Sequence, residues 1–154
     1  MTLKVGDRIP EVLGKDQVGN LVRSAFFKGR KLVLYFYPKD NTPGCTAQAC
    51  SLRDGYEDLK VKGFAVVGVS VDSEASHQKF IQKYKLPFPL ISDSKKELVR
   101  RFGVWKEKKS FGRTYMGTVR TTFIVDEEGV IKDIITGRKV VTKNHALQVL
   151  DLEI

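Results

Sequence analysis

Two continuous apolar runs of strand length dominate the hydrophobic pattern of the chain. They are Lys31–Tyr37 (KLVLYFY) and Phe64–Val71 (FAVVGVSV). Because neither run alternates with polar residues, both are predicted to be strands buried on both faces of a sheet. Leu90–Ser92 predicts a short third strand. Val119–Val125 and Val130–Thr136 lie on either side of a Glu-Glu-Gly turn and predict a hairpin.

The segment between the first two predicted strands has the periodicity of a helix. Thr42 is an N-cap candidate followed by proline at the first helical position, which predicts a helix that runs to about Lys62 and stops at Gly63. Its apolar residues form one stripe at spacings of 4, 3, 4 and 3: Cys45, Ala49, Leu52, Tyr56 and Leu59.

Three further helices are predicted from capping residues and apolar faces. Asp72 or Ser73 is expected to cap the first, with Phe80, Ile81 and Tyr84 inward; the second covers about Lys95–Phe102 and ends at Gly103; Thr142 is expected to cap the last, with Ala146, Leu147, Val149 and Leu150 inward.

The element order is β-α-β-α-(β)-α-β-β-α, which predicts an α/β fold. Alternating strands and helices pair in parallel through right-handed crossovers, and the final hairpin adds an antiparallel pair. The result is a central mixed β-sheet flanked by helices, in the order of the thioredoxin fold, with an N-terminal extension before Lys31. The segment Val104–Gly117 is expected to be irregular.

Length and composition agree with one globular domain over residues 1–154. The 154 residues are 42% hydrophobic and 29% charged, which is enough to bury a core and disfavours disorder. No apolar run approaches the ~20 residues of a membrane span. The first residues, MTLKVGD, contain no signal-type apolar segment. A cytoplasmic location is therefore expected, in which two cysteines are more often reactive or inert than bridged.

Positive charge is concentrated in one segment. The net charge is +9, and Lys95–Arg113 alone holds eight basic and two acidic residues, with Trp105, Phe111 and Tyr115 in or just after it. A solvated lysine-rich face is the simplest interpretation. The alternatives are a nucleic-acid-binding module, with bases stacked on the aromatics, and a patch that steers an acidic reductant protein.

Cys45 is the more informative of the two cysteines. With Thr42 as N-cap it is the third helical residue, where unpaired N–H groups and the helix dipole favour the thiolate, the reactive form of cysteine. Pro43 donates no N–H, and Gly44 lets a small substrate approach the backbone. Thr42 would place its hydroxyl near the sulfur, and a plain N-cap role is compatible with this.

Cys50 lies five residues further along the same helix. Helical geometry separates the two Cα atoms by roughly 8.6 Å, whereas a disulfide tolerates at most about 7 Å. Either the two cysteines never pair, or the start of the helix unwinds when they do. Two buried, inert cysteines are the alternative.

Few other residues could assist such a thiol. A metal site would need His77 and His145, which lie in no metal-ligand spacing, and His77 is expected at the edge of its helix.

Arg120 is a lone basic residue in a β-forming segment. It is either a cation for the reactive site or an outward-facing surface arginine.

The segment Tyr37–Cys50 (YPKDNTPGCTAQAC) closely resembles the active-site segment of peroxiredoxins, and its C-x4-C spacing resembles that of the bacterioferritin comigratory protein, or Q, subfamily. The resemblance extends over nearly the whole chain through the segments Val69–Asp72, Leu86–Asp93, Tyr115–Phe123 and Thr142–His145.

This resemblance implies a thiol peroxidase in antioxidant defence. Cys45 matches the peroxidatic cysteine, which becomes a sulfenic acid on reaction with hydrogen peroxide or an organic hydroperoxide. Cys50 matches the resolving cysteine, which forms an intramolecular disulfide that a thioredoxin-type dithiol reduces. Pro38 matches the residue that shields the nucleophile, Thr42 the hydroxyl that holds the peroxide, and Arg120 the arginine that stabilises the thiolate.

The resemblance further implies that the backbone amides of Gly44 and Cys45 bind the peroxide oxygens, that no metal or organic cofactor is needed, and that the protein is a monomer. Neither a membrane nor a specific nucleic acid is expected as partner. One departure is Gln48, where relatives often carry glutamate. A neutral amide there is expected to do no harm, because a carboxylate would disfavour the thiolate. A thioredoxin-type oxidoreductase would instead require C-x-x-C.

Overall fold

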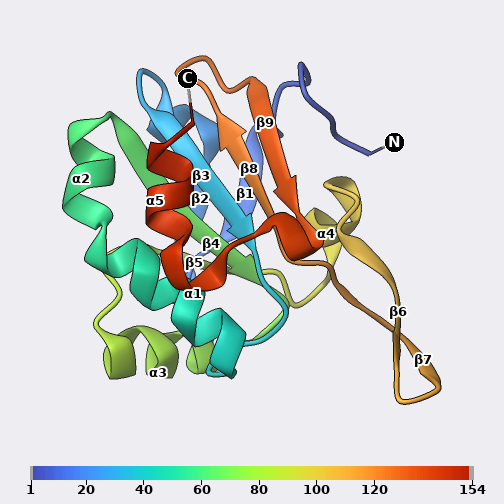
Figure 1. Cartoon of the computed structure of the whole chain (residues 1–154). Helices are drawn as coiled ribbons and strands as arrows, with labels where there is room; N and C mark the ends of the chain where they lie inside the picture. Colours follow the sequence, from blue (N-terminus) through green and yellow to red (C-terminus); the bar gives the residue numbers. More distant parts are fainter. Residues whose placement is uncertain (1, 153–154) are drawn as a thin grey trace.

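A mixed sheet forms the centre of the computed structural model, which describes residues 2–152. Within this range the sheet has five strands in the order β5-β4-β3-β8-β9. The middle strand, β3 (Lys31–Phe36), pairs in parallel with β4 (Phe64–Ser70) and antiparallel with β8 (Thr121–Val125). The predicted central mixed sheet flanked by helices is therefore confirmed (Figure 1).

The remaining elements follow the predicted order. The outer strands of the sheet are β5 (Leu90–Ser92) and β9 (Ile131–Thr136). The helices are α1 (Pro43–Asp54), α2 (Tyr56–Val61), α3 (Glu74–Tyr84), α4 (Glu97–Arg101) and α5 (His145–Leu150). Two separate ribbons are β1 (Val12–Lys15) with β2 (Leu21–Arg23), and β6 (Trp105–Ser110) with β7 (Arg113–Thr118). Short 3-10 turns are η1 (Ser24–Phe27), η2 (Gly137–Lys139) and η3 (Thr142–Asn144).

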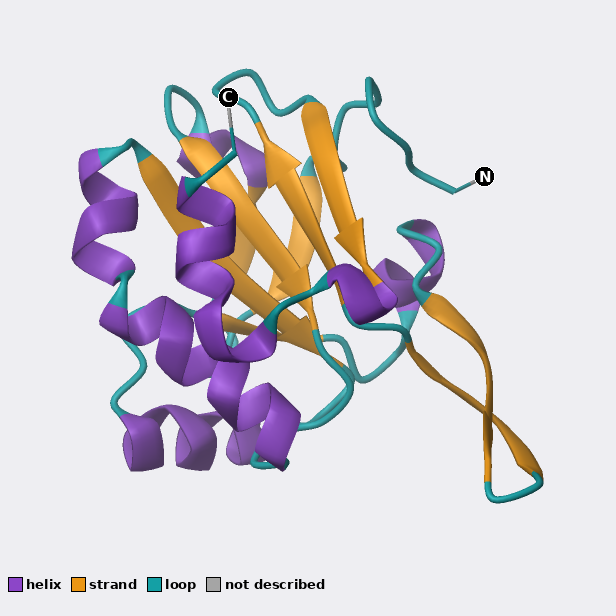
Figure 2. Ribbon diagram, viewed as in Figure 1, coloured by secondary structure: helices purple, strands orange, loops and turns teal. Residues whose placement is uncertain are grey.

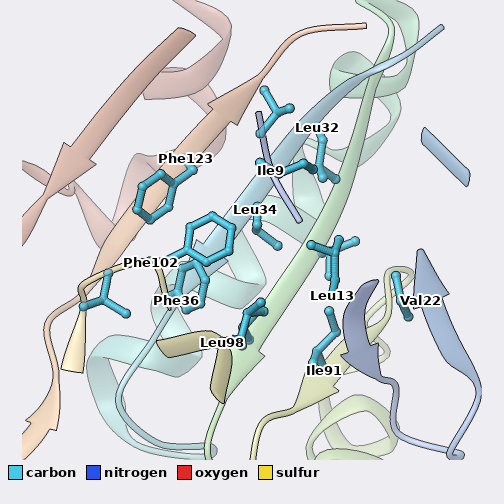
Figure 3. Close-up of a cluster of buried hydrophobic side chains, with 14 of the residues drawn as sticks. Ile9, Leu13, Val22, Leu32, Leu34, Phe36, Ile91, Leu98, Phe102 and Phe123 are labelled. Carbon is cyan, nitrogen blue, oxygen red and sulfur yellow. The ribbon is translucent and has the colours of Figure 1, made fainter. Parts of the chain in front are cut away.

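Strand β3 is buried on both faces, as its apolar run predicts. Leu32, Leu34 and Phe36 point to one face of the sheet, where they pack against the N-terminal extension and α4 (Figure 3). Val33 and Tyr35 point to the other face, which helices cover (Figure 2). The side chains packed there from α1, α3 and α5 include Cys45, Ala49, Phe80 and Val149. The helix that carries Cys45 therefore lies on one face, and the extension before Lys31 covers the opposite one.

The predicted long helix is wrong in one respect, because it is divided at Gly55. α1 ends at Asp54 and α2 begins at Tyr56. A Cβ atom at Gly55 would lie 2.5 Å from the Cβ of Ala146 on α5. The contact with α5 therefore requires glycine at the break. The predicted apolar stripe is nevertheless buried at Cys45, Ala49, Leu52 and Leu59, with Tyr56 partly buried.

The segment expected to be irregular is in fact a regular hairpin. β6 and β7 pair from Trp105 with Thr118 to Ser110 with Arg113. Phe111 and Gly112 form the two-residue turn, both with positive φ (51° and 75°), as in a type I′ hairpin. Sequence periodicity misses the hairpin because most of its side chains are exposed on both faces, so no apolar alternation marks it.

Two details of the C-terminal helix differ from expectation. Thr142 begins the 3-10 turn η3 and caps no α-helix, since α5 starts at His145 after Asn144. Leu147, expected on the inner face, is 58% exposed, whereas Ala146 and Val149 are buried. At about 100° per helical residue, the buried His145, Ala146 and Val149 share one side of α5, and Leu147 lies beyond its edge. No helix within residues 2–152 is long and apolar enough to cross a membrane.

Candidate active site

Cys45 lies in the first turn of α1 and faces the sheet. Its side chain is 1% exposed. Thr42 has the extended backbone of an N-cap, and its carbonyl accepts the Thr46 N–H at 2.8 Å. The N–H groups of Gly44 and Cys45 precede this first helical bond, so no carbonyl one turn back can accept from them. They remain available to an oxygen ligand beside the sulfur.

Thr42 does not cap the helix through its side chain, contrary to the expected N-cap role of its hydroxyl. Its Oγ1 donates to the Lys39 carbonyl at 2.8 Å, and no helical N–H binds to it. The single hydroxyl proton is therefore used within the loop. The oxygen retains its lone pairs, so towards a peroxide Thr42 can act as an acceptor of an O–H.

Arg120 points inward, and the alternative of an outward-facing arginine is wrong. It lies in the short connection before β8, just outside the strand predicted to contain it. Its Nη2 donates to the Sγ of Cys45 at 3.4 Å, and its Nη1 donates to the Oε1 of Gln48 at 2.6 Å. A Cβ at Gly44 would approach Nη2 to 3.1 Å, so glycine leaves room for the guanidinium. One cation thus bridges the sulfur and the helix.

Gln48 orients this arginine from one turn further along α1. Its side chain is fully buried, and its Nε2 has no hydrogen-bond partner. Because the amide oxygen accepts from Arg120, one guanidinium N–H is held in place while the other remains directed at Cys45. The neutral amide adds no negative charge beside the sulfur.

Two side chains next to Cys45 and Arg120, Tyr35 and Gln48, carry buried polar atoms without a partner. Over residues 2–152, buried side-chain polar atoms without a hydrogen-bond partner are found on Tyr35, Gln48 and Thr118. Burial raises the pKa of the Tyr35 phenol well above its usual value, and electrostatic interaction with Cys45 adds to this effect. Tyr35 is thus a neutral hydroxyl near the sulfur. Such orphaned groups indicate a site for water or a polar ligand.

The loop that carries Pro38 and Thr42 is fixed by a buried polar network centred on Asp40. His77 is fully buried, which corrects its expected place at a helix edge. Its Nδ1 lies 2.6 Å from Asp40 Oδ2 and its Nε2 lies 2.9 Å from the Ile91 carbonyl. A carbonyl only accepts, so Nε2 carries a proton. The contact between Nδ1 and the Asp40 carboxyl is a short hydrogen bond between two buried side chains.

Asp40 accepts two further hydrogen bonds. The Tyr37 hydroxyl donates to Oδ1 at 2.5 Å, and the Ser76 hydroxyl donates to Oδ2 at 2.8 Å. The Asp40 backbone N–H donates to Asp72 at 2.8 Å. The network therefore connects the end of β3, the start of α3 and the active-site loop. Pro38, two residues before Asp40, is half-buried on the same loop.

Within residues 2–152, one group of histidine, cysteine, aspartate or glutamate side chains is close enough together to hold a metal ion. It consists of Asp40, Asp72 and His77, whose ligand atoms lie within 4.8 Å of one another. Each of the three already makes hydrogen bonds within the chain. Neither cysteine belongs to the group. We therefore interpret it as an anchor of the active-site loop.

His145 supports the other side of the site. Its Nδ1 lies 2.9 Å from Gln148 Oε1, which also accepts the Val141 N–H, so Nδ1 is the donor. Its Nε2 then accepts from the Thr122 hydroxyl at 2.8 Å. Burial lowers the pKa of His145, with a smaller contribution from the positive charge of Arg120. The ring is therefore a neutral structural element.

Both cysteines are free thiols on α1. Cys50 is half-buried, whereas Cys45 is buried. The helix is continuous from Pro43 to Asp54, so both cysteines lie on intact helix. The structure thus has the reduced arrangement that the helical spacing requires, in which the two sulfurs do not bond.

Of the residues singled out from the sequence, Gly44, Cys45 and Arg120 come together in this site. Thr42 immediately precedes their helix, and Pro38 lies on the loop before it. Two further residues of the site, Tyr35 and Asp40, are not predicted by the sequence, and His77 is misplaced by it. Tyr35 and Asp40 lie within or beside the apolar run, where no periodic signal separates a polar contact from packing. Only the polar residues directly after a buried strand could have indicated Asp40.

The comparisons with known proteins agree with this geometry. The model of the AhpC/TSA family matches residues 5–134. Peroxiredoxin Bcp of Bacillus subtilis is 44% identical over 97% of this chain and 94% of its own length, and Peroxiredoxin Bcp of Escherichia coli K12 is 42% identical over 93% and 90%. The structure of a Xylella fastidiosa PrxQ mutant has a TM-score of 0.87 and 31% identity, covering 98% of this chain and 95% of that one.

A second solved structure, of the Xanthomonas campestris bacterioferritin comigratory protein, has a TM-score of 0.82 and 34% identity over 94% of this chain and 95% of its own. These similarities span the whole fold and include the segment that carries the cysteine, the arginine and the anchored loop. The chain therefore belongs to the AhpC/TSA family and is a thiol peroxidase of the Bcp, or Q, type of peroxiredoxin.

Proposed function

We propose that the chain reduces hydrogen peroxide and organic hydroperoxides through Cys45. The observation that carries this proposal is the contact of 3.4 Å between the Arg120 guanidinium and the Cys45 sulfur in the first turn of α1. The thiolate attacks one peroxide oxygen, the O–O bond breaks, and Cys45 becomes a sulfenic acid. The other oxygen leaves with the bonding electron pair and takes a proton, giving water or an alcohol.

The surroundings of the sulfur supply the electrostatics for this step. The N–H groups of Gly44 and Cys45 and the guanidinium of Arg120 are donors for the oxygen that develops negative charge. The Thr42 hydroxyl, whose own proton is bound to Lys39, accepts the peroxide O–H. Pro38 covers the sulfur from bulk water.

Cys50 resolves the sulfenic acid in this proposal. Its thiolate attacks the Cys45 sulfur, hydroxide leaves and is protonated to water, and an intramolecular disulfide forms. Since both cysteines lie on an intact helix, the first turns of α1 must unwind for this step. A dithiol protein of the thioredoxin type then reduces the disulfide by exchange and is itself oxidised.

The wider role follows from this cycle. We infer that residues 1–154 form one domain that acts as a cytoplasmic monomer in antioxidant defence, since peroxidatic and resolving cysteines lie on the same chain. The Xanthomonas campestris bacterioferritin comigratory protein has alkyl peroxide reduction activity. Its similarity to this chain supports organic hydroperoxides as substrates here. The chemistry of the site requires no metal or organic cofactor.

The test is peroxide titration of the wild type, Cys45→Ser and Cys50→Ser, with free thiols and intact mass measured on each. The wild type should lose two thiols and two mass units. Cys50→Ser should stop at a sulfenic or over-oxidised Cys45, and Cys45→Ser should barely react. A Cys45→Ser protein that consumes peroxide at the wild-type rate would exclude Cys45 as the peroxidatic residue.

A further inference from the structure

The β6–β7 hairpin is a part of the molecule that the peroxidatic chemistry does not use. It projects from the body beyond α4 (Figure 1). Phe111 at its tip is fully exposed, and Tyr115 and Met116 are about half exposed, at 48% and 52%. A ribbon that buries so little apolar surface gains little stability from the core. Its persistence as a paired hairpin therefore indicates a role outside the fold.

The two faces of this ribbon carry different charge. Residues directly opposite each other share a face, so the register places Lys106 with Gly117, Lys108 with Tyr115, and Ser110 with Arg113 on one side. This side, the basic face, holds three cations and no acidic residue. The single acidic residue of the hairpin, Glu107, lies on the other side beside Met116.

The basic face is continuous with the reactive site. Lys108 turns back from the ribbon, and its Nζ donates to the Thr118 carbonyl at 2.9 Å, two residues before Arg120. Burial lowers the pKa of Lys108 and the charge of Arg120 lowers it further, while Cys45 acts in the opposite sense. Both catalytic groups are thus within electrostatic reach of Lys108. By contrast, Lys106 and Arg113 are exposed and form no ion pair with any residue in the range 2–152.

We propose that the basic face of the β6–β7 hairpin, with Phe111 at its tip, is the docking surface for an acidic dithiol protein that reduces the Cys45–Cys50 disulfide. The proposal rests on the proposed peroxidase cycle and names the surface through which its reductant binds.

The observations favour a protein over other occupants. A projecting ribbon exposed on both sides lacks the concavity that small-molecule sites require, so the occupant must supply its own surface. Exposed aromatic, methionine and arginine side chains are enriched at protein interfaces, and complementary charge steers the approach of a protein partner. A second copy of this chain would present the same positive face and be repelled. A redox partner, moreover, has to reach the disulfide, and the basic face leads directly to it.

The tip residue supports the same conclusion. Phe111 has φ of 51° in a turn position that favours glycine or asparagine. A bulky aromatic side chain is therefore not required by the turn and costs backbone strain there. A hydrophobic anchor that inserts into a partner accounts for its presence.

The experiment compares two charge-reversal variants of the full chain. The ribbon variant is Lys106→Glu/Arg113→Glu, and Lys108 is left unchanged because it contacts the site. The control is Lys15→Glu/Lys28→Glu, which makes the same change of net charge at two exposed lysines of the N-terminal extension. Peroxidase turnover is measured with an acidic thioredoxin, thioredoxin reductase and NADPH, and separately with dithiothreitol, at low and high salt.

The ribbon variant should raise the KM for thioredoxin about tenfold at low salt, well beyond any change in its dithiothreitol-supported rate, and the control should change it less than about twofold. Phe111→Ala should raise it about threefold in a salt-independent manner. Equal KM values for the ribbon variant and the wild type would overturn the proposal, and so would equal effects of the ribbon variant and the control.

A fluorescent single-stranded oligonucleotide serves as the competing probe. If the ribbon variant lost oligonucleotide binding while its KM for thioredoxin stayed at the wild-type value, the hairpin would be a nucleic-acid surface and the docking proposal would be wrong. Failure of the peroxidase cycle itself is distinguishable, because dithiothreitol would then support no turnover in the wild type.

Discussion

Nδ1 of His77 lies 2.6 Å from Oδ2 of Asp40, and neither side chain is more than 3% exposed. The pair is the point at which the active-site loop is fastened to α3. Because Nε2 of His77 is bound to the Ile91 carbonyl, the ring cannot turn away without losing a second hydrogen bond. Removal of either partner leaves the other buried and unpaired.

His77→Ala should therefore lower the free energy of unfolding by about 3–5 kcal/mol, the cost of breaking a buried pair on one side. Lys79→Ala, on the exposed side of the same helix, should change it by less than about 0.5 kcal/mol. Urea denaturation of both variants at pH 7 measures the difference. A His77→Ala protein with wild-type stability would show that the pair does not fasten the loop.

Arg120 is expected to control the reactivity of Cys45. Arg120→Gln removes the positive charge at the sulfur and should reduce the second-order rate constant for hydrogen peroxide by about 10²–10³-fold. Arg120→Lys retains the charge but cannot bridge Cys45 and Gln48 at once. Its rate constant should therefore lie between those of the wild type and Arg120→Gln. Competition kinetics against a haem peroxidase measure these values. A change of less than twofold in Arg120→Gln would contradict this role.

Stability at mildly acidic pH should depend on His145. Its pKa is lowered in the folded state, so below about 6.5, the ordinary histidine value, the unfolded chain takes up a proton that the folded chain does not. The contribution of this group is therefore constant above that pH and is lost progressively as pH falls below it. His145→Gln should reduce the slope of stability against pH between about 6.5 and 5. Parallel slopes for wild type and variant would refute the prediction.

The sequence predicts the sheet well and the exposed parts poorly. Continuous burial of β3 and β4 leaves a long apolar run, and Leu90–Ser92 is found at its predicted bounds. The β6–β7 hairpin buries almost nothing, so its pairing depends on a turn at Phe111 and Gly112 and leaves no periodic pattern.

The site shows the same division. The position of Cys45 in the first turn of a helix follows from the local signals of Thr42 and Pro43. Arg120 is marked by being a lone basic residue in a β-forming segment, and its side chain does point inward. The contact of His77 with Asp40 joins residues 37 positions apart, and no local rule indicates it. The division of the long helix at Gly55 likewise depends on Ala146, which lies on a distant element.

The contact between Gly55 and Ala146 gives a quantitative test of that packing. Gly55→Ala places a methyl group against the Ala146 methyl at a distance that neither backbone can accommodate unchanged, and should cost about 1–3 kcal/mol. Ala146→Gly alone should cost about 1 kcal/mol through helix propensity. In the double variant the clash is absent, so its total cost should be less than the sum of the two single costs. Additive costs in a double-mutant cycle would contradict a direct contact.

Unwinding of α1 is the step on which the proposed two-cysteine cycle depends. About 8.6 Å between the Cα atoms of Cys45 and Cys50 on an intact helix exceeds the ~7 Å limit of a disulfide, so the oxidised protein must lose helix between them. The Asp40–His77 anchor lies just before this segment and should confine the unwinding to residues after Thr42.

Hydrogen exchange of the peroxide-oxidised wild type should therefore show faster exchange in residues 43–50, with Asp40 and α3 still protected. Cys50→Ser, which forms no disulfide, should keep its protection after the same treatment. Oxidised wild-type protein that retains full protection in 43–50 while intact mass shows the loss of two hydrogens would mean that the disulfide forms without unwinding, and helical geometry would then not forbid the bond.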